Sequence, residues 1–140
     1  MKELLVALML WIGANTDFNT DFPLPEVIRM DKAPLEYQYF KGEAPRDSNV
    51  HGFYNLNDKK IYIRGEYPLD HPWAQGLLLH ELLHYIQDMN NVKFNCVAEM
   101  ERDAWPLQQK YLKEVHNFDW EYDALWHLFI SSCRDDDYRG

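Results

Sequence analysis

His80-Glu81-Leu82-Leu83-His84 lies in a leucine-rich segment that predicts the central helix of this chain. Residues four apart lie on one face of an α-helix, so both imidazoles can reach a single metal ion. Glu81 lies one position further round the helix, where its carboxylate can take a proton from a water molecule that the metal activates. We therefore expect Zn2+ as the cofactor, His80 and His84 as metal ligands, and Glu81 as the catalytic base.

The residues around this motif predict a long helix from about Pro72 to Met89. Proline is tolerated in the first turn of a helix, and Asn90-Asn91 supply turn-forming residues directly after its end. The apolar positions are too many for one narrow stripe, so we expect this helix to be mostly buried in the centre of the fold. These positions are Leu77, Leu78, Leu79, Leu82, Leu83 and Ile86.

Three other segments are predicted to be helical. Two of them follow the motif, at about residues 96–115 and 120–133. The third is residues 4–12, an unbroken apolar run that ends near Gly13. A short buried helix suits this run better than a signal peptide does, because its single preceding lysine is offset by Glu3.

A β-hairpin precedes the central helix. Residues 52–56 and 60–64 are its two arms, and Asn57-Asp58 supplies the turn chemistry between them. Residues 26–30 are expected to add a short strand, while residues 33–40 fit either a helix or a strand. Helices with a short sheet predict an α+β fold in one domain, residues 1–140. We expect residues 61–64 to be the edge strand to which an extended peptide adds.

Two histidines leave zinc without a third protein ligand, which a catalytic site generally has beside a position for water. The metzincin pattern would place Gly and His at positions 87 and 90, where this chain has Gln87 and Asn90. The following helix offers Glu99 and Glu101, which point about 200° apart, so at most one faces the metal. We favour Glu101, because the small Ala104 on its face lets the two helices approach closely, and keep Glu99 as the alternative.

His80-Glu81-x-x-His84 followed by Glu101-x-x-Ala104 resembles the pattern of the gluzincin metallopeptidases, and especially of the small minigluzincin-type members. More closely, residues 50–112 look like a bacterial family of metallopeptidase-like proteins of about this length. The resemblance implies a small zincin-like domain in which His80, His84 and Glu101 hold zinc and Glu81 is the general base. It implies no particular substrate.

One departure from that family lies next to the third ligand. Many relatives have Glu-Ala-Tyr where this chain has Asp103-Ala104-Trp105, and this change leaves the ligand assignment intact. Each imidazole needs a partner that orients it, and Asp103 or Asp88 could do so, although a helix-surface aspartate such as Asp88 is more often simply solvated.

Several aromatic residues and histidines remain to be placed. Tyr85, Tyr111 and His116 are candidate donors to the oxyanion that forms during hydrolysis. Three tryptophans at helical positions are expected to lie in the core and not in a substrate site: Trp105, Trp120 and Trp126.

Two functions fit this pattern. The favoured one is a zinc-dependent metallopeptidase, and metal-assisted hydrolysis of a non-peptide amide or ester is a related chemistry. The alternative is a zinc-bound interaction or regulatory module of the same fold that cleaves nothing, in which a fourth protein ligand replaces water. No motif in the sequence clearly supplies that fourth ligand, so we favour the enzyme.

The composition limits the partners and the location. The formal charge of −9, from 23 acidic and 14 basic side chains, argues against a nucleic-acid partner. Residues 4–12 are too few to span a membrane, so we expect no stable membrane span. The expected partner is a peptide or protein substrate. A cytoplasmic location is slightly favoured, but a disulfide between Cys96 and Cys133 would favour a secreted or envelope location. The acidic run at residues 135–137 is expected to be a solvated terminus.

Overall fold

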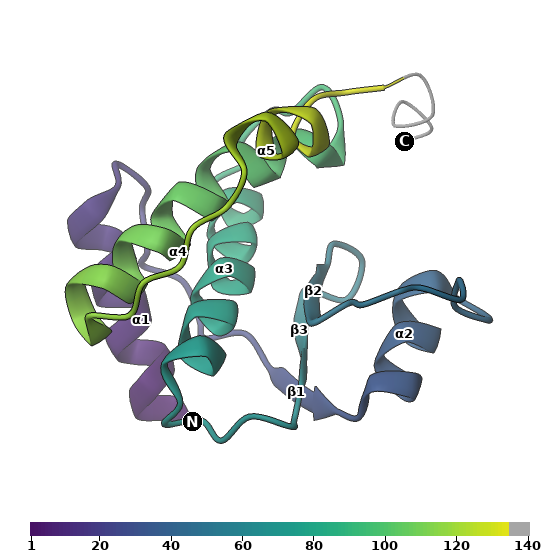
Figure 1. The fold of residues 1–140 in the computed structure, drawn as a ribbon. Helices are drawn as coiled ribbons and strands as arrows, with labels where there is room; N and C mark the ends of the chain where they lie inside the picture. The colour runs from purple at the N-terminus through teal and green to yellow at the C-terminus, as the bar shows by residue number, and fades with distance from the viewer. Residues whose placement is uncertain (135–140) are drawn as a thin grey trace.

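The computed structural model describes residues 1–134 and has an α+β fold, as predicted (Figure 1). The acidic run at residues 135–137 lies outside the described residues. Within residues 1–134, none of the helices has both the length and the apolar character that crossing a membrane requires. The elements follow in the order α1 (Lys2–Asn15), β1 (Val27–Met30), α2 (Lys32–Phe40), β2 (Gly52–Asn55), β3 (Lys60–Arg64), α3 (Pro72–Met89), the 3-10 turn η1 (Val97–Met100), α4 (Glu101–His116) and α5 (Ala124–Ile130).

Helix α3 has the predicted bounds and is largely buried. His71 caps its N-terminus, because Nδ1 of that side chain accepts a hydrogen bond from the Trp73 amide at 3.1 Å. Its leucines pack with the buried side chains of α1 in one core. Helix α1 contains residues 4–12, which confirms that this segment is helical. The buried side chains of this core include Leu5, Leu8, Ile12, Leu78, Leu82 and Ile86.

Helices α3 and α4 lie side by side (Figure 1). A β-carbon added at Gly76 of α3 would lie 2.9 Å from Cδ2 of Leu112 in α4, so a larger residue there would push the helices apart. Ala104, which was expected at the close contact, is fully buried. Small residues thus let α4 approach α3 closely, and this approach carries Glu101 to the face of α3 that bears the histidines.

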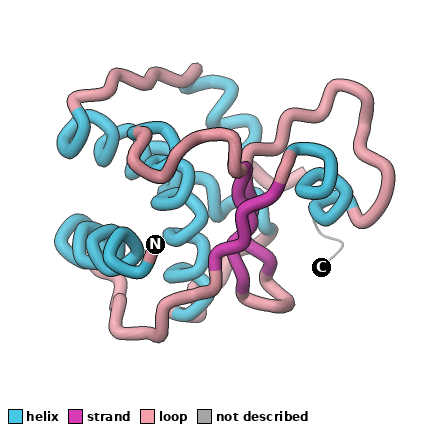
Figure 2. The backbone as a smooth tube through the Cα atoms, turned by 90° about the horizontal axis from the view of Figure 1, so that it is seen from below, coloured by secondary structure: helices cyan, strands magenta, loops and turns pink. Residues whose placement is uncertain are grey.

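The three strands lie between α2 and the helical group that contains α1 and α3 (Figure 2). Their order is β1-β3-β2: β1 pairs with β3 in parallel, and β2 pairs with β3 antiparallel as the predicted hairpin. The expectation that residues 61–64 form an edge strand was therefore wrong. β1 covers the other side of β3, whose residues 61–64 are all buried. β1 and β2 are the two edge strands, and β2 is the one that lies beside α3.

The C-terminal helix is shorter than predicted. Asp123 caps it by accepting a hydrogen bond from the Trp126 amide at 3.0 Å, so α5 begins at Ala124 and residues 120–123 stay outside the helix. The helix buries none of its residues. Trp126 is 55% exposed, so the expectation that it lies in the core was wrong.

A disulfide joins Cys96, just before η1, to Cys133, just after α5. This bond is the condition under which the sequence favoured a secreted or envelope location. It closes a loop with a sequence separation of 37 residues, which contains all of α4.

Removing this disulfide is expected to lower the free energy of unfolding by about 4 kcal/mol, because the open chain gains loop entropy when it unfolds. Urea denaturation of the wild type and of the double variant Cys96→Ser/Cys133→Ser measures the difference. The mass gained on alkylation, with and without prior reduction, reports whether the bond is formed. The prediction would be contradicted if the wild type resists alkylation before reduction, so that its disulfide is formed, and still unfolds at the same urea concentration as the double variant.

Candidate metal centre

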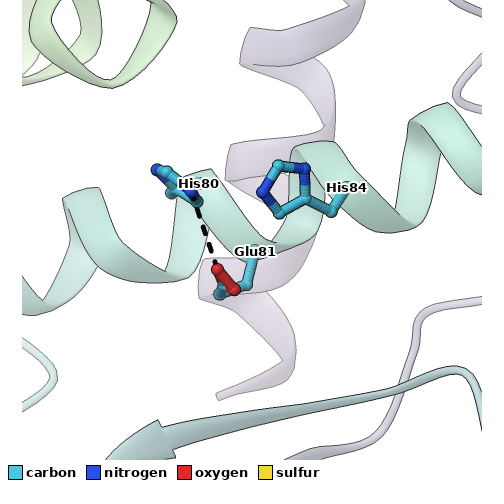
Figure 3. A group of neighbouring side chains, drawn as sticks. All are labelled: His80, Glu81 and His84. Atoms are coloured by element: carbon cyan, nitrogen blue, oxygen red, sulfur yellow. Dashed lines mark ion pairs between the residues drawn. The ribbon is translucent and has the colours of Figure 1, made fainter. Parts of the chain in front are cut away.

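Two elements bring the four predicted site residues together. His80 and His84 lie on successive turns of α3 with Glu81 between them, and ligand atoms of these three residues lie within 4.8 Å of one another (Figure 3). Glu101 is the first residue of α4 and contacts both imidazoles. Its Oε2 lies 2.9 Å from Nε2 of His80, and its Oε1 lies 2.8 Å from Nε2 of His84.

Glu99, the alternative third ligand, is engaged elsewhere. Its carboxylate pairs with Arg102 at 3.0 Å and accepts a hydrogen bond from the amide of Asn95. It also lies close to Cys96 and Cys133, but their sulfur atoms are bonded to each other. The contacts of the imidazoles therefore single out Glu101, the residue that the sequence favoured.

Two glutamines orient the imidazoles. Oε1 of Gln108 lies 2.8 Å from Nδ1 of His80, and Oε1 of Gln87 lies 2.9 Å from Nδ1 of His84. The amide nitrogen of Gln87 donates to the carbonyl of Met100, which leaves its oxygen for the imidazole. An amide oxygen only accepts, so each Nδ1 carries a proton, and in the neutral imidazole each Nε2 then presents its lone pair to Glu101.

This arrangement brings acceptor atoms face to face. In the neutral form, the two Nε2 lone pairs point at two carboxylate oxygens of Glu101 at under 3 Å. Such a contact is repulsive unless positive charge lies between the atoms, supplied by protons or by a metal ion. Two imidazoles and one carboxylate are also the donor set that suits catalytic zinc. The residues present therefore fit a zinc ion.

The pKa values of the two histidines and of Glu101 also show that positive charge is favoured at this site. Burial lowers the pKa of His80, but the Glu101 carboxylate outweighs this effect and raises it to about 9. The pKa of His84 is also raised, because Glu101 again outweighs burial. Burial raises the pKa of Glu101, but the two histidines together hold it well below its usual range. A cation held at these three groups is thus strongly stabilised by Glu101.

Glu81 lies against the site without serving as a bridge. Its Oε1 is 3.7 Å from Nε2 of His80 (Figure 3), and its Oε2 is buried with no hydrogen-bond partner among the described residues. Burial raises the pKa of Glu81, which makes its carboxylate a stronger base. A buried carboxylate oxygen with a free lone pair is suited to receive a proton.

The predicted supporting residues lie elsewhere. Asp88 accepts hydrogen bonds from Tyr54 and Lys59, and Asp103 is exposed, so neither orients an imidazole. The glutamines take that role instead. The spacing could have indicated Gln87, because it lies one helical turn after His84 on the same face.

The predicted oxyanion donors are also engaged elsewhere. The hydroxyl of Tyr85 donates to the carbonyl of Pro23, and the hydroxyl of Tyr111 donates to Gln75 and contacts His116. Tyr39 at the end of α2, which the sequence did not suggest, lines a cavity with Glu81, His84 and Glu101. Burial and the two glutamates raise the pKa of Tyr39, so its hydroxyl stays protonated at neutral pH.

Two cavities flank the candidate metal centre and share Gly52 and Glu81. The first, here called the His84-side cavity, has a volume of about 180 Å³. The second, here called the tryptophan cavity, has a volume of about 190 Å³ and opens beside His80. The His84-side cavity is walled by Tyr39, Phe53, Tyr54, Leu56, Val97 and Met100. The tryptophan cavity is walled by His51, Trp73, Leu77, Trp105, Gln108 and Trp120.

Gly52 lies at the junction of the cavities, on the edge strand β2. A β-carbon there would lie 3.0 Å from the carbonyl oxygen of Tyr62, 3.1 Å from Cγ2 of Ile63 and 3.6 Å from Cγ of Glu81. A side chain at this position would therefore crowd β3 at Tyr62 and Ile63, while its contact with Glu81 would be an ordinary one. Glycine lets β2 pass between the two cavities without this crowding.

Replacing Gln108 by leucine is expected to weaken zinc binding by about 10- to 100-fold, because the proton on Nδ1 of His80 loses its acceptor and the ring loses its orientation. Competition with a fluorescent chelator measures the affinity. Replacing the neighbouring Gln109, whose amide donates to the carbonyl of Trp120 and touches neither imidazole, provides the matched control. Equal zinc affinities for Gln108→Leu and the wild type would contradict the assigned role.

Comparison with known proteins gives one match. The model of a family described as "Domain of unknown function (DUF6647)" matches residues 1–138. No curated protein and no solved structure matches the chain.

Proposed function

This chain belongs to the DUF6647 family, and we propose that it is a zinc-dependent metallopeptidase. The observation that carries the proposal is the convergence of Nε2 of His80 and Nε2 of His84 on the two oxygens of Glu101, a contact that protons or a metal ion must bridge. His80, His84 and Glu101 are the three residues that would hold zinc. Bound zinc would supply a Lewis acid that activates water and polarises a scissile carbonyl.

The residues of the chain supply the rest of the chemistry. Glu81 removes a proton from the attacking water with its unpartnered, buried Oε2 and later passes it to the leaving amine. Gln87 and Gln108 keep both imidazoles in the tautomer that presents Nε2. Tyr39, which lines the His84-side cavity and whose hydroxyl is protonated, donates a hydrogen bond to the carbonyl oxygen on which negative charge develops.

The edge strand β2 gives an extended peptide a place to bind. It pairs on one side with β3, and among the described residues no strand pairs with its other side. Gly52 on this strand lies between the two cavities and next to Glu81. A peptide that adds to this edge would carry its backbone past Glu81 and its side chains into the cavities on either side. This geometry favours a peptide over a compact amide or ester.

Zinc content and peptide cleavage together test the proposal. Elemental analysis of the purified protein is expected to find one zinc per chain, and a fluorescence-quenched peptide library is expected to be cleaved. Removing the metal with a chelator should stop cleavage, and adding zinc back should restore it. Stoichiometric zinc without cleavage of any library member would favour the non-catalytic interaction module. Absence of a stoichiometric metal would overturn the metal centre itself.

A further inference from the structure

The wall of the tryptophan cavity is unusually rich in large aromatic side chains. Trp73 near the start of α3, Trp105 in α4 and Trp120 in the segment after α4 meet there, together with Leu77. These residues come from three separate parts of the chain. Trp120 was expected in the core but lies outside the core cluster, and Trp105 packs against that cluster while also lining the cavity. The tryptophans thus form a recess as well as a packing contact.

The walls are held in place before any ligand arrives. The ring of Trp120 contacts both other indoles, with ring centroids 5.5 Å from that of Trp73 and 5.9 Å from that of Trp105. The indole nitrogen of Trp105 donates to Oε2 of Glu101 at 3.0 Å, and Gln109 donates to the carbonyl of Trp120. A preformed apolar recess binds an apolar group with little cost in conformational entropy.

The charges around the recess disfavour ionic occupants. Among the described residues that line it, Glu81 is the only carboxylate and none is a lysine or arginine. An acidic side chain would lie against Glu81, whose Oε2 already lacks a partner. A basic side chain could stack on the indoles, but it would lie beside His80 and the positive charge that Glu101 favours at the two imidazoles, whether protons or a metal ion supply it. A neutral apolar group meets neither conflict.

We infer that the tryptophan cavity is the side-chain pocket that sets the substrate class: peptides with a large apolar residue, preferably aromatic, next to the bond that is cleaved. The inference rests on the proposed function, because the cavity adjoins the candidate metal centre through His80, Glu81 and Gln108. A phenylalanine ring entering the recess would meet the faces and edges of the indoles in the arrangements that aromatic rings prefer. An alanine methyl group would leave most of the recess empty.

The tryptophans themselves report the binding. The chain has five tryptophans, so a ¹H–¹⁵N spectrum shows five indole signals. N-acetyl-phenylalanine methylamide, titrated into the metal-free protein, is expected to shift the signals of Trp73, Trp105 and Trp120. The signals of Trp11, which contacts Tyr111, and of the exposed Trp126 serve as internal controls. The alanine, aspartate and lysine analogues are expected to bind at least about 10-fold more weakly than the phenylalanine analogue.

Substitutions in two walls of the tryptophan cavity test whether the probe binds in this cavity. Trp120→Ala removes one wall and is expected to weaken binding of the phenylalanine probe by about 10-fold, while Trp126→Ala should leave it unchanged. Leu77→Trp fills the recess from a different wall and is expected to abolish the preference for phenylalanine over alanine. Circular dichroism and the melting temperature show whether each variant is folded.

The outcomes separate this inference from the proposed function, because the titration needs neither zinc nor activity. Equal affinities for the phenylalanine and alanine probes, or a preference for the lysine or aspartate probe, would overturn the inference even if the protein cleaves peptides. Selective binding of the phenylalanine probe by a protein that never holds zinc would support the pocket and overturn the peptidase. In an active protein, library cleavage should show the same preference at one position beside the scissile bond.

Discussion

Replacing Glu81 by glutamine is expected to lower kcat for peptide cleavage by about 1,000-fold while leaving zinc bound. Glutamine has the size of glutamate but no basic oxygen, so the attacking water keeps its proton. The three residues that would hold zinc are unchanged, because Glu81 contributes only a 3.7 Å contact to His80. The loss corresponds to about 4 kcal/mol of transition-state stabilisation. The measurement is kcat on a cleaved library peptide, together with zinc content by elemental analysis.

The matched control is Glu114→Gln, which makes the same change on the exposed side of α4, where Glu114 only approaches Lys110 at 3.8 Å. This control should keep both activity and zinc. Cleavage by Glu81→Gln at the wild-type rate would show that the base is a different residue. Loss of zinc from this variant would show that Glu81 is a ligand.

Replacing Glu101 by alanine is expected to weaken zinc binding by more than about 100-fold, which exceeds the usual effect of removing a group that only orients a ligand. The change removes the carboxylate whose two oxygens contact both imidazoles. Zinc should therefore no longer raise the melting temperature of the variant. In the wild type, zinc at 100 times its Kd should stabilise the fold by about 2.7 kcal/mol.

Glu99→Ala is the control for this experiment, since Glu99 lies two residues earlier and pairs with Arg102. It should bind zinc as tightly as the wild type. The pair of variants thus distinguishes a specific ligand from a general effect of negative charge near η1. Equal losses of zinc affinity in both variants, or a loss only in Glu99→Ala, would refute Glu101 as the third ligand.

The local features of this protein could be predicted because each depends on neighbouring residues. Periodicity and end signals predicted α3 at its observed bounds, and the turn residues Asn57-Asp58 predicted the hairpin. The four-residue spacing placed His80 and His84 on one face of α3, since a helix repeats every 3.6 residues. The small Ala104 even distinguished Glu101 from Glu99, because close helix packing needs a small residue on the shared face.

Features that depend on distant contacts could not be predicted in this way. β1 pairs in parallel with β3 although the paired residues lie more than 30 positions apart in the sequence. This distant pairing covers one side of β3, so the prediction that β3 is the edge strand of the hairpin was wrong and β2 has that place. The orienting role of Gln108 depends on the approach of α4 to α3. The shift of Trp120 from core to cavity wall depends on α5 starting only at Ala124, after the cap at Asp123.

The difference between the features that could be predicted and those that could not has one physical reason. Helical and hairpin geometry follows from backbone sterics and side-chain periodicity over a few residues, so the amino-acid order alone sets the helix that carries His80, Glu81 and His84. The site becomes a candidate metal centre only when packing brings Glu101, Gln87 and Gln108 to those imidazoles. The cavities on either side likewise arise from residues that only the packed chain brings together.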